Sequence, residues 1–420
     1  MASKIIDARR LNVILVCSAL VLLSSVVGGL IMSGFEPQLT PVMTTEKTTL
    51  VEDILTRDGE IRALWIATVA NINFPSESNL TSEELKAEID SILTTALENS
   101  MNTVIFQVRP SSDALYASSL FPSSEFLCGA QGNRLPLDTL EYLTTEAHKL
   151  DIAVCAWVNP LRVSTSMNAS EGDPALLSEN NPAFIHPEYC IGYNGSLYYD
   201  PGLPEVRALI SEGVKEIAEG YPVDAIIFDD YFYPYPVENE VYDDSASYAK
   251  YGNGMDLEDW RRENVNAMIK SSHDIIKAVR PDCYFGISPF GIWCNNDGTN
   301  NGSDTKGLSA FSAIYCDALA WIEGGYIDFI SPQLYWSFDT EAAPYGVLCD
   351  WWDKALADTD IPLIVSHGAY RAGEWSSPTE ISDQIEYARQ KKSYMGSAFY
   401  GYSAIKANSN GICQCFKEVY

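Results

Sequence analysis

The sequence predicts a (β/α)8 barrel, the TIM-barrel class of α/β fold, preceded by an N-terminal transmembrane helix. Two patterns predict the barrel: eight short apolar runs follow one another from Glu60 onward, and amphipathic stretches separate them. Strands that alternate with helices form right-handed βαβ units around a parallel sheet. Eight such units in about 360 residues fit the usual size of this barrel. A doubly wound open sheet is the alternative, but no glycine-rich phosphate loop follows the first run.

The N-terminal segment predicts the membrane helix. Lys4, Arg9 and Arg10 precede an uncharged run over residues 11–35, which is longer than the roughly 20 apolar residues that span a bilayer. Basic residues before the run predict a cytoplasmic N-terminus and an exported C-terminal part. The alternative is a cleaved signal peptide and a secreted protein, although the run is long for a signal and lacks a clear small-residue cleavage site.

Residues 36–59 are polar, rich in Thr and Glu, and without periodicity, which is typical of a linker. The barrel domain then occupies residues 60–420. Its expected strands are the apolar runs 62–69, 102–109, 152–160, 223–229, 284–290, 326–334, 362–368 and 396–402. Its expected helices are 82–99, 137–150, 204–219, 257–279, 308–323, 345–358 and 378–392. The first of these has Thr81 or Ser82 as its N-cap, with acidic residues in its first turn.

Three connections are long, at residues 110–136, 161–203 and 234–256. Each follows the carboxyl end of an expected strand, which is the end of a barrel where active sites are built. Loops longer than about 12–15 residues usually act as lids or binding walls. The three connections of this chain are rich in Ser, Asn, Tyr and Pro, a composition that suits a cleft for a polymer.

The fourth apolar run ends in two adjacent carboxylates, Asp229 and Asp230, followed at once by Tyr231, Phe232 and Tyr233. Charge is costly inside a buried strand, so the pair is expected where the strand leaves the core. Acidic groups beside aromatic rings suit carbohydrate chemistry, because carboxyls transfer protons and rings stack on sugar faces. As neighbours on a strand the two acids start out facing opposite ways, so a second catalytic carboxyl is expected from another loop. The candidates are Asp113, Asp297, Asp304 and Glu374.

The other strand ends add polar and aromatic side chains to the same rim. The residues expected to bind substrate there are Arg109, Asp113, Trp157, Asn159, Arg162, Tyr231, Trp293, Gln333, Tyr335, Trp336, His367 and Arg371. The three arginines are expected to lower the pKa of the carboxyls or to bind a substrate carboxylate, with structural salt bridges as the alternative. His367 is interpreted as a sugar contact or a buried histidine, not as a metal ligand.

The composition excludes other classes of partner. The chain has 57 acidic against 27 basic residues and a net charge of −30, so nucleic acid is not an expected partner. The ten cysteines lack the spacing and the histidine company of a zinc site. We expect neither a metal nor an organic cofactor, because carboxyls and water suffice for glycoside hydrolysis.

The chain resembles the glycosyl-hydrolase-like 10 family of bacterial envelope proteins over nearly all of residues 60–405. The matching segments, in order, are residues 62–71, 106–110, 113–116, 146–149, 156–160, 200–202, 228–234, 286–293 and 332–336. The resemblance implies a TIM-barrel glycosidase that is exported or anchored, and at least one relative acts on peptidoglycan strands stripped of their stem peptides. The family often has a Gly and a polar residue, commonly His, where this chain has Ala225 and Ile227.

Together these observations predict a membrane-anchored glycoside hydrolase that acts outside the cell on peptidoglycan glycan strands. Asp229 is expected to be the nucleophile or base, and Asp230 its supporting acid. Ile227 motivates one alternative, a non-catalytic glycan-binding protein on a degenerate barrel. The other alternative is a hydrolase of a different polysaccharide.

Overall fold

The computed structural model describes residues 59–165, 172–299 and 301–420. The expected membrane span at residues 11–35 and nearly all of the expected linker lie outside these ranges. Within the described ranges, no helix combines the length and the apolar character that crossing a membrane requires.

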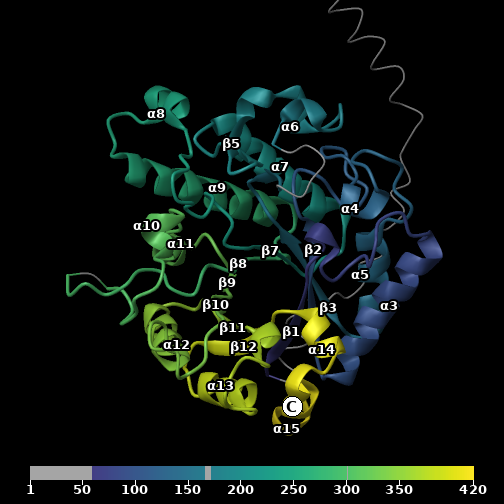
Figure 1. Cartoon of the computed structure of the whole chain (residues 1–420), viewed down its shortest axis with the longest axis vertical. Helices are drawn as coiled ribbons and strands as arrows, with labels where there is room; N and C mark the ends of the chain where they lie inside the picture. Colours follow the sequence, from purple (N-terminus) through teal and green to yellow (C-terminus); the bar gives the residue numbers. More distant parts are fainter. Residues whose placement is uncertain (1–58, 166–171, 300) are drawn as a thin grey trace, which may run out of the picture. The chain divides into compact units, whose positions relative to one another are not determined.

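Eight parallel strand positions close into a barrel, with helices around them (Figure 1). The strands are β1 (Ile61–Ile66), β2 (Thr103–Arg109), β3 (Ala153–Val158), β7 (Ala225–Phe228), β8 (Tyr284–Ile287), β9 (Phe329–Ile330), β10 (Gln333–Leu334), β11 (Leu363–His367) and β12 (Tyr394–Phe399). Their order is β10-β11-β12-β1-β2-β3-β7-β8-β9, and a β11–β9 pairing closes the ring. The predicted (β/α)8 barrel is therefore confirmed, and closure rules out the open sheet.

The sixth barrel strand is split into two short pieces, β9 and β10. Pro332 lies between them and has no N–H to donate to a neighbouring strand. Its carbonyl oxygen still accepts a hydrogen bond from the backbone N–H of Ser366 (3.0 Å), which keeps this position attached to β11.

Seven of the surrounding helices correspond to the amphipathic stretches in the sequence, and an eighth follows the last strand. They are α3 (Ser82–Glu98), α5 (Thr139–Lys149), α7 (Pro204–Gly220), α9 (Leu257–Val279), α11 (Ala318–Gly324), α12 (Tyr345–Ala355), α13 (Glu380–Ala388) and α15 (Ile412–Val419). The expected helix 308–323 is broken into α10 (Ala310–Ala313) and α11 by a turn in which Tyr315 has a φ of 55°. Thr81 caps α3 in a capping box with Glu84, as the sequence predicts.

Side chains along each strand alternate between two apolar layers. One row points out and packs against the helices, whereas the other fills the barrel interior. In β7, Ile226 and Phe228 belong to the outer layer, and Ala225 and Ile227 belong to the inner one. Trp65 and Trp157 join the inner layer near the carboxyl ends of their strands. The interior is thus apolar directly below the position that Asp229 occupies.

The three long connections all leave the carboxyl ends of strands, as expected. The first, after β2, contains α4 (Glu125–Cys128), and the third, after β7, contains α8 (Ser245–Tyr251). The second, after β3, contains α6 (Pro182–Ile185) and a small antiparallel sheet in the order β4-β6-β5. The strands of this sheet are β4 (Arg162–Ser164), β5 (Cys190–Tyr193) and β6 (Ser196–Tyr199). In Figure 1, α6, β5 and α8 lie in the upper part of the view, in teal to green, and α4 lies further right, in blue.

Candidate active site

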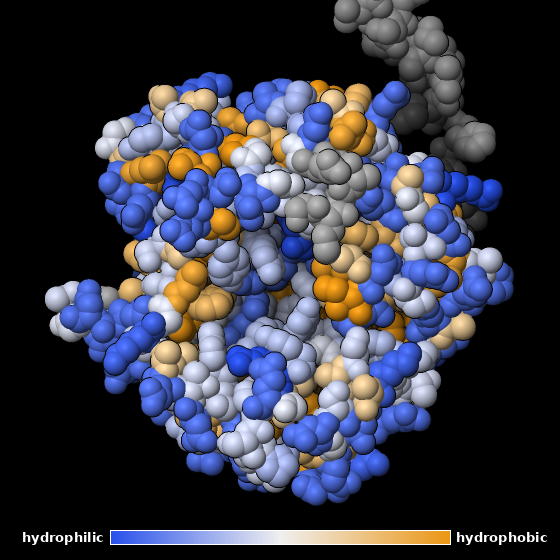
Figure 2. All heavy atoms as spheres, viewed as in Figure 1, coloured by the Kyte–Doolittle hydropathy of each residue, from blue (hydrophilic) through white to orange (hydrophobic). Residues whose placement is uncertain are grey.

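A cleft of about 250 Å³ opens at the carboxyl ends of the strands. Its walls are Trp65, Trp157, Asp229, Asp230, Tyr231, Tyr235, Phe290, Gln333, Tyr335, Tyr370 and Tyr400. The face drawn in Figure 2 is hollowed near its centre, over the barrel strands of Figure 1. Carboxyls and aromatic rings make up most of this lining.

A smaller cavity of about 80 Å³ lies at the opposite, amino ends of the strands. Its lining is mainly apolar and includes Ile61, Ile105 and Phe329. Because the functional groups of barrel proteins lie at the carboxyl ends, the larger, polar cleft is the candidate active site.

Both carboxyls of the Asp229–Asp230 pair line the cleft. Asp229 continues the inward row of Ala225 and Ile227. Strand β7 ends at Phe228, however, and the chain turns so that the Phe232 N–H bonds the Asp230 carbonyl (3.0 Å). The alternation of a regular strand no longer applies there, so the two acids do not face opposite ways. They are only 3% and 4% exposed.

The Asp229 carboxylate is held by donors from the neighbouring strand β3. Its Oδ2 accepts a hydrogen bond from Trp157 Nε1 (2.9 Å) and a second from the Asn159 side-chain amide. Among the described residues, its Oδ1 accepts a single long contact, from the Tyr231 backbone N–H (3.3 Å). One oxygen is therefore fixed by two side chains, and the other retains capacity to accept a hydrogen bond from a substrate.

Asp230 has its partners on the opposite side of the cleft. Its Oδ1 accepts a hydrogen bond from Gln333 Nε2 (2.9 Å), and its Oδ2 accepts one from the Tyr235 hydroxyl. Gln333 comes from β10, and Tyr235 from the start of the third long connection. The two acids are thus oriented by different parts of the barrel.

Burial raises the pKa values of both carboxyls, and the charge of Asp230 adds to the rise at Asp229. Desolvation, with the charge of Asp230 as the next cause, raises the pKa of Asp229 from 3.8 to about 7. Desolvation also raises the pKa of Asp230, against the hydrogen bonds from Tyr235 and Gln333, which favour the charged form. The pair therefore retains a proton near neutral pH, as a general acid requires.

Arg162 supplies the nearest positive charge to the pair, and it opposes the rise in pKa at both carboxyls. Its Nε donates to the Pro110 carbonyl oxygen (2.8 Å), and Nη2 donates to the Asn159 side-chain oxygen. The guanidinium lies 5.1 Å from the centre of the Tyr231 ring. Arg162 thus orients the Asn159 amide that donates to Asp229. Its positive charge favours the charged forms of both carboxyls.

Aromatic rings form the walls of the cleft. Trp65 and Trp157 meet edge to face, with ring centroids 5.0 Å apart. Tyr335 stacks on Tyr400 with centroids 5.9 Å apart, and Tyr370 meets both rings edge-on. Such flat apolar faces, close to polar groups, are suited to stacking on sugar rings.

Eight of the twelve residues expected on the rim are absent from the lining of this cleft. Two of them, Asn159 and Arg162, support Asp229 through the hydrogen bonds given above. The other six lie elsewhere, beginning with Arg109 and Asp113. Arg109 is fully buried between β2 and α7, outside the barrel interior. Its guanidinium lies 3.9 Å from the Phe121 ring centre. A register shift in β2 pairs Arg109 with Val158, which belongs to the outer layer. Its Nη1 occupies space that a Cβ on Gly213 of α7 would fill. Asp113 is buried in the first connection beside Gln131 (3.4 Å).

The other four lie at the edges of the barrel end. Trp293 donates to Asp317 (3.3 Å), and Trp336 packs against the outer side of Phe290. Arg371 bonds Glu374 (2.9 Å) and the Tyr335 carbonyl oxygen (2.8 Å). For His367, the sequence left a sugar contact or a buried histidine as alternatives, and the structure shows a buried histidine. It contacts Gln384 (3.0 Å) and Ser397 (2.9 Å), and desolvation lowers its pKa to about 4, so it is neutral.

The expected second carboxyl from another loop is not found among the described cleft residues. Asp297 accepts hydrogen bonds within its own turn from Thr299, and Asp304 is exposed. Asp113 and Glu374 have the positions given above. Five residues of the lining are absent from the set that was expected to bind substrate: Trp65, Tyr235, Phe290, Tyr370 and Tyr400. Among the described residues, no group of three or more His, Cys, Asp or Glu is placed to hold a metal ion.

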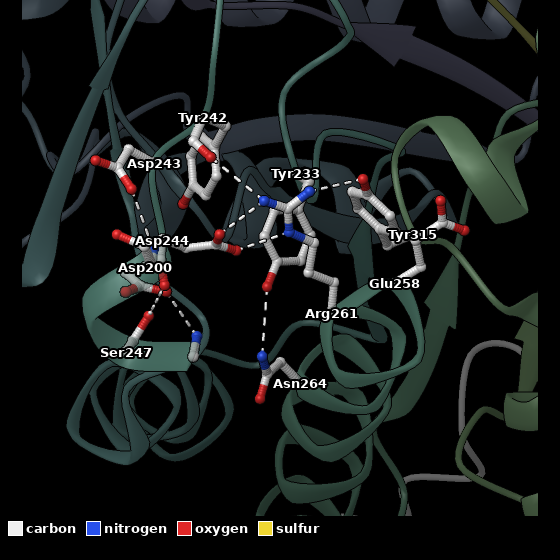
Figure 3. A network of polar contacts seen from close by, with 12 residues as sticks. Asp200, Tyr233, Tyr242, Asp243, Asp244, Ser247, Glu258, Arg261, Asn264 and Tyr315 are labelled. Carbon is white, nitrogen blue, oxygen red and sulfur yellow. Dashed lines mark hydrogen bonds and ion pairs between the residues drawn. The ribbon is translucent and has the colours of Figure 1, made fainter. Parts of the chain in front are cut away.

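A polar network joins the third long connection, which also carries Tyr235, to α9 (Figure 3). Arg261 of α9 donates to both carboxylate oxygens of Asp244 (2.7 and 2.6 Å) and to the Tyr315 hydroxyl (2.7 Å). Tyr233 packs edge-on against the Tyr315 ring, at a centroid distance of 5.1 Å. The network joins the third connection to α9, so it positions the tyrosine that contacts Asp230.

Comparisons of sequence agree with this arrangement. The model of a family described as Glycosyl hydrolase-like 10 matches residues 60–381. Glycosyl hydrolase YngK of Bacillus subtilis (strain 168) is 40% identical over 363 residues, covering 84% of this chain and 70% of YngK. Glycosyl hydrolase DigH of Escherichia coli (strain K12) is 34% identical over 326 residues, covering 75% of this chain and 74% of DigH.

Solved structures of low sequence identity share the fold. The PgaB (BpsB) glycoside hydrolase domain from Bordetella bronchiseptica has a TM-score of 0.52 and 15% identity, covering 86% of this chain and 98% of that one. The endo-β-1,4-mannanase from Thermotoga petrophila has a TM-score of 0.51 and 11% identity, covering 81% and 67%. The barrel is thus one that glycoside hydrolases use.

Proposed function

This chain belongs to the glycosyl hydrolase-like 10 family, and we propose that it hydrolyses the glycan strands of peptidoglycan outside the cell. One observation carries the proposal: two buried, adjacent carboxyls share an aromatic-lined cleft at the carboxyl end of a barrel. Relatives named glycosyl hydrolases support the reaction class. The proposed substrate is a polymer, which suits an open cleft at the barrel end from which three long connections leave.

In this proposal Asp230 gives a proton to the leaving oxygen of the glycosidic bond, and Asp229 acts at the anomeric carbon. Retained protonation near neutral pH suits the acid, because burial raises the pKa of both carboxyls. The rings of Tyr335 and Tyr400 provide a stacking surface for a sugar unit beside the carboxyls. The positive charge of Arg162 opposes the rise in pKa at both carboxyls and so favours the charged form that Asp229 needs.

We also propose that the catalytic domain is held outside the cell by the N-terminal segment. The support is in the sequence, where basic residues precede the uncharged run 11–35. Fractionation of cells that produce the full chain tests this part separately. We expect the protein in the membrane fraction and its barrel open to external protease, whereas recovery from the medium alone would favour a cleaved signal.

The test of the activity is mass spectrometry of peptide-free peptidoglycan strands incubated with the full-length chain. We expect shortened saccharides from the wild type and from Asp304→Asn, an exposed carboxyl-to-amide control. Asp229→Ala is expected to give none, a loss of at least 10³-fold in rate. Strands bound but left intact by the wild type would favour a glycan-binding protein, which the apolar Ile227 beneath the carboxyls motivates. Cleavage of another polysaccharide instead would replace the substrate.

A further inference from the structure

The position of the two acids constrains how the sugar is attacked. In direct displacement, the acid and the nucleophile flank the glycosidic bond and approach the anomeric carbon from opposite faces. Asp229 and Asp230 are consecutive residues on one strand end, and both enter the cleft from that side. No third carboxyl is present among the described residues of the cleft lining. The pair therefore supplies an acid and a second, adjacent carboxylate. It does not supply a nucleophile on the face of the anomeric carbon opposite the acid.

The hydrogen bonds of Asp229 suit a different task. Trp157 and the Asn159 amide fix its Oδ2, whereas Oδ1 has, within the described ranges, only the long contact of 3.3 Å to the Tyr231 N–H. A carboxylate held this way accepts a further hydrogen bond from an N–H donor of the substrate. Glycans of 2-acetamido sugars carry such a donor next to the anomeric carbon, in the acetamido group itself.

The apolar rings of Trp65 and Trp157 in the cleft suit the methyl end of an acetamido group. Trp65 and Trp157 meet edge to face at 5.0 Å, and both line the cleft. Trp157 also donates to Asp229, so an apolar ring lies directly beside the carboxylate. An acetyl methyl group placed against these rings would point its N–H toward Asp229 and its carbonyl oxygen toward the anomeric carbon.

We propose that the nucleophile is the acetamido oxygen of the substrate, oriented by Asp229, while Asp230 is the general acid and base. This inference rests on the proposed function and specifies its substrate class as β-linked 2-acetamido glycans. Substrate assistance is a known route for glycoside hydrolases that lack an enzymic nucleophile. Gln333 and Tyr235 then orient the Asp230 carboxyl toward the leaving oxygen.

The bonds balance over two steps. In the first, the acetamido oxygen forms a bond to the anomeric carbon, and the glycosidic C–O bond breaks. Its electron pair goes to the leaving oxygen, which takes the proton of Asp230, and Asp229 stabilises the positive oxazolinium ion through its N–H. In the second, water attacks the anomeric carbon and gives a proton to Asp230, the ring opens, and the acetamido group is restored. The net reaction adds one water with retained configuration.

The experiment compares peptide-free peptidoglycan strands with the same strands after chemical removal of the N-acetyl groups. We expect the full-length wild type to cleave the acetylated strands with retention, seen by proton NMR, and to lose at least 100-fold in rate on the deacetylated ones. N-acetylglucosamine-thiazoline, a stable mimic of the cyclic ion, is expected to inhibit competitively. Equal rates on both strands, an inverted product, or a glycosyl group trapped covalently on Asp229 would overturn the inference but leave the glycosidase function intact.

Two variants separate the roles of the acids. On an aryl glycoside, whose leaving group departs without a proton, azide is expected to rescue Asp230→Ala and to give a β-glycosyl azide, because azide replaces water and needs no base. Azide is expected to leave Asp229→Ala unrescued. Rescue of Asp229→Ala with an α-glycosyl azide would identify Asp229 as a direct nucleophile and overturn the inference. Lack of cleavage of any strand by the wild type would overturn both this inference and the proposed function.

Discussion

Asp229→Asn is expected to stabilise the protein in a strongly pH-dependent way, although it removes an acid from the cleft. Asp229 is only 3% exposed and lies beside a second buried carboxyl. Its pKa rises from 3.8 to about 7 on folding. The native state therefore binds the proton more tightly than the unfolded state, and the wild type loses stability as pH increases between these two values.

The size of the effect follows from the shift in pKa. Each unit is worth about 1.36 kcal/mol, so the wild type loses about 4 kcal/mol of unfolding free energy between pH 4 and pH 8. The amide of Asn is uncharged at every pH, so the variant does not lose this unfolding free energy as pH increases. It does place an N–H₂ group where a carboxylate oxygen now accepts hydrogen bonds, which costs about 1 kcal/mol at every pH. The variant should be slightly less stable than the wild type at pH 4 and about 3 kcal/mol more stable at pH 8.

Thermal unfolding at pH values from 4 to 9 measures this difference. With an unfolding entropy of about 2.1 cal/mol/K per residue, 3 kcal/mol over roughly 360 residues raises Tm by about 4 °C at pH 8. Asp304→Asn is the matched control, because it makes the same change of charge at an exposed position. Curves for wild type and Asp229→Asn that stay parallel across the whole pH range would refute the reasoning, since burial would then not raise the pKa of Asp229.

The remaining predictions concern the rate and the supporting residues. The kcat/KM of the wild type should fall about tenfold per pH unit above about pH 7, where the carboxyl pair loses its proton; a flat profile to pH 9 would contradict this. Tyr235→Phe removes a donor that favours charged Asp230, so the alkaline limb should move to higher pH and the rate should drop about tenfold. Arg261→Gln breaks the paired bonds to Asp244 and should lower both Tm and kcat, whereas an effect on Tm alone would mean that the network does not position Tyr235.

The fold is well determined by local patterns. Apolar runs buried on both faces, separated by amphipathic helices, predict the barrel strands and seven of its helices. The differences have local causes: Pro332 splits the sixth strand, and the turn at Tyr315 breaks a helix whose pattern is continuous in the sequence. The last helix, α15, was not expected because it follows the eighth strand, after the repeating units are complete.

The site is predicted less completely, because its details depend on geometry that the sequence does not contain. Asp229, Trp157 and Asn159 come together as expected, since parallel strands end on one rim. Arg109 does not, because a register shift near the end of β2 turns it toward the helices. Trp65 was missed although it is the penultimate residue of β1, the same position that Trp157 has in β3. The pairing of Tyr235 with Asp230 depends on a turn that follows the strand.

Ile227, where the resemblance in sequence led us to expect a polar residue, has a defined place in the barrel. Ile227 is fully buried in the inner layer with Trp65 and Trp157, two residues before Asp229 on the same strand face. Because an apolar residue there adds to the desolvation of Asp229, we expect Ile227 to contribute to the raised pKa of this carboxyl.

Ile227→Asn tests this role, with Ile227→Val as the control that removes volume but adds no polar group. A buried amide near Asp229 solvates the charged carboxylate, so the alkaline limb of kcat/KM should move to lower pH by about one unit. The control should keep the limb in place and cost about 1 kcal/mol of stability. If both variants shift the limb equally, the packing of the barrel floor, and not its polarity, would set the pKa of the acid pair.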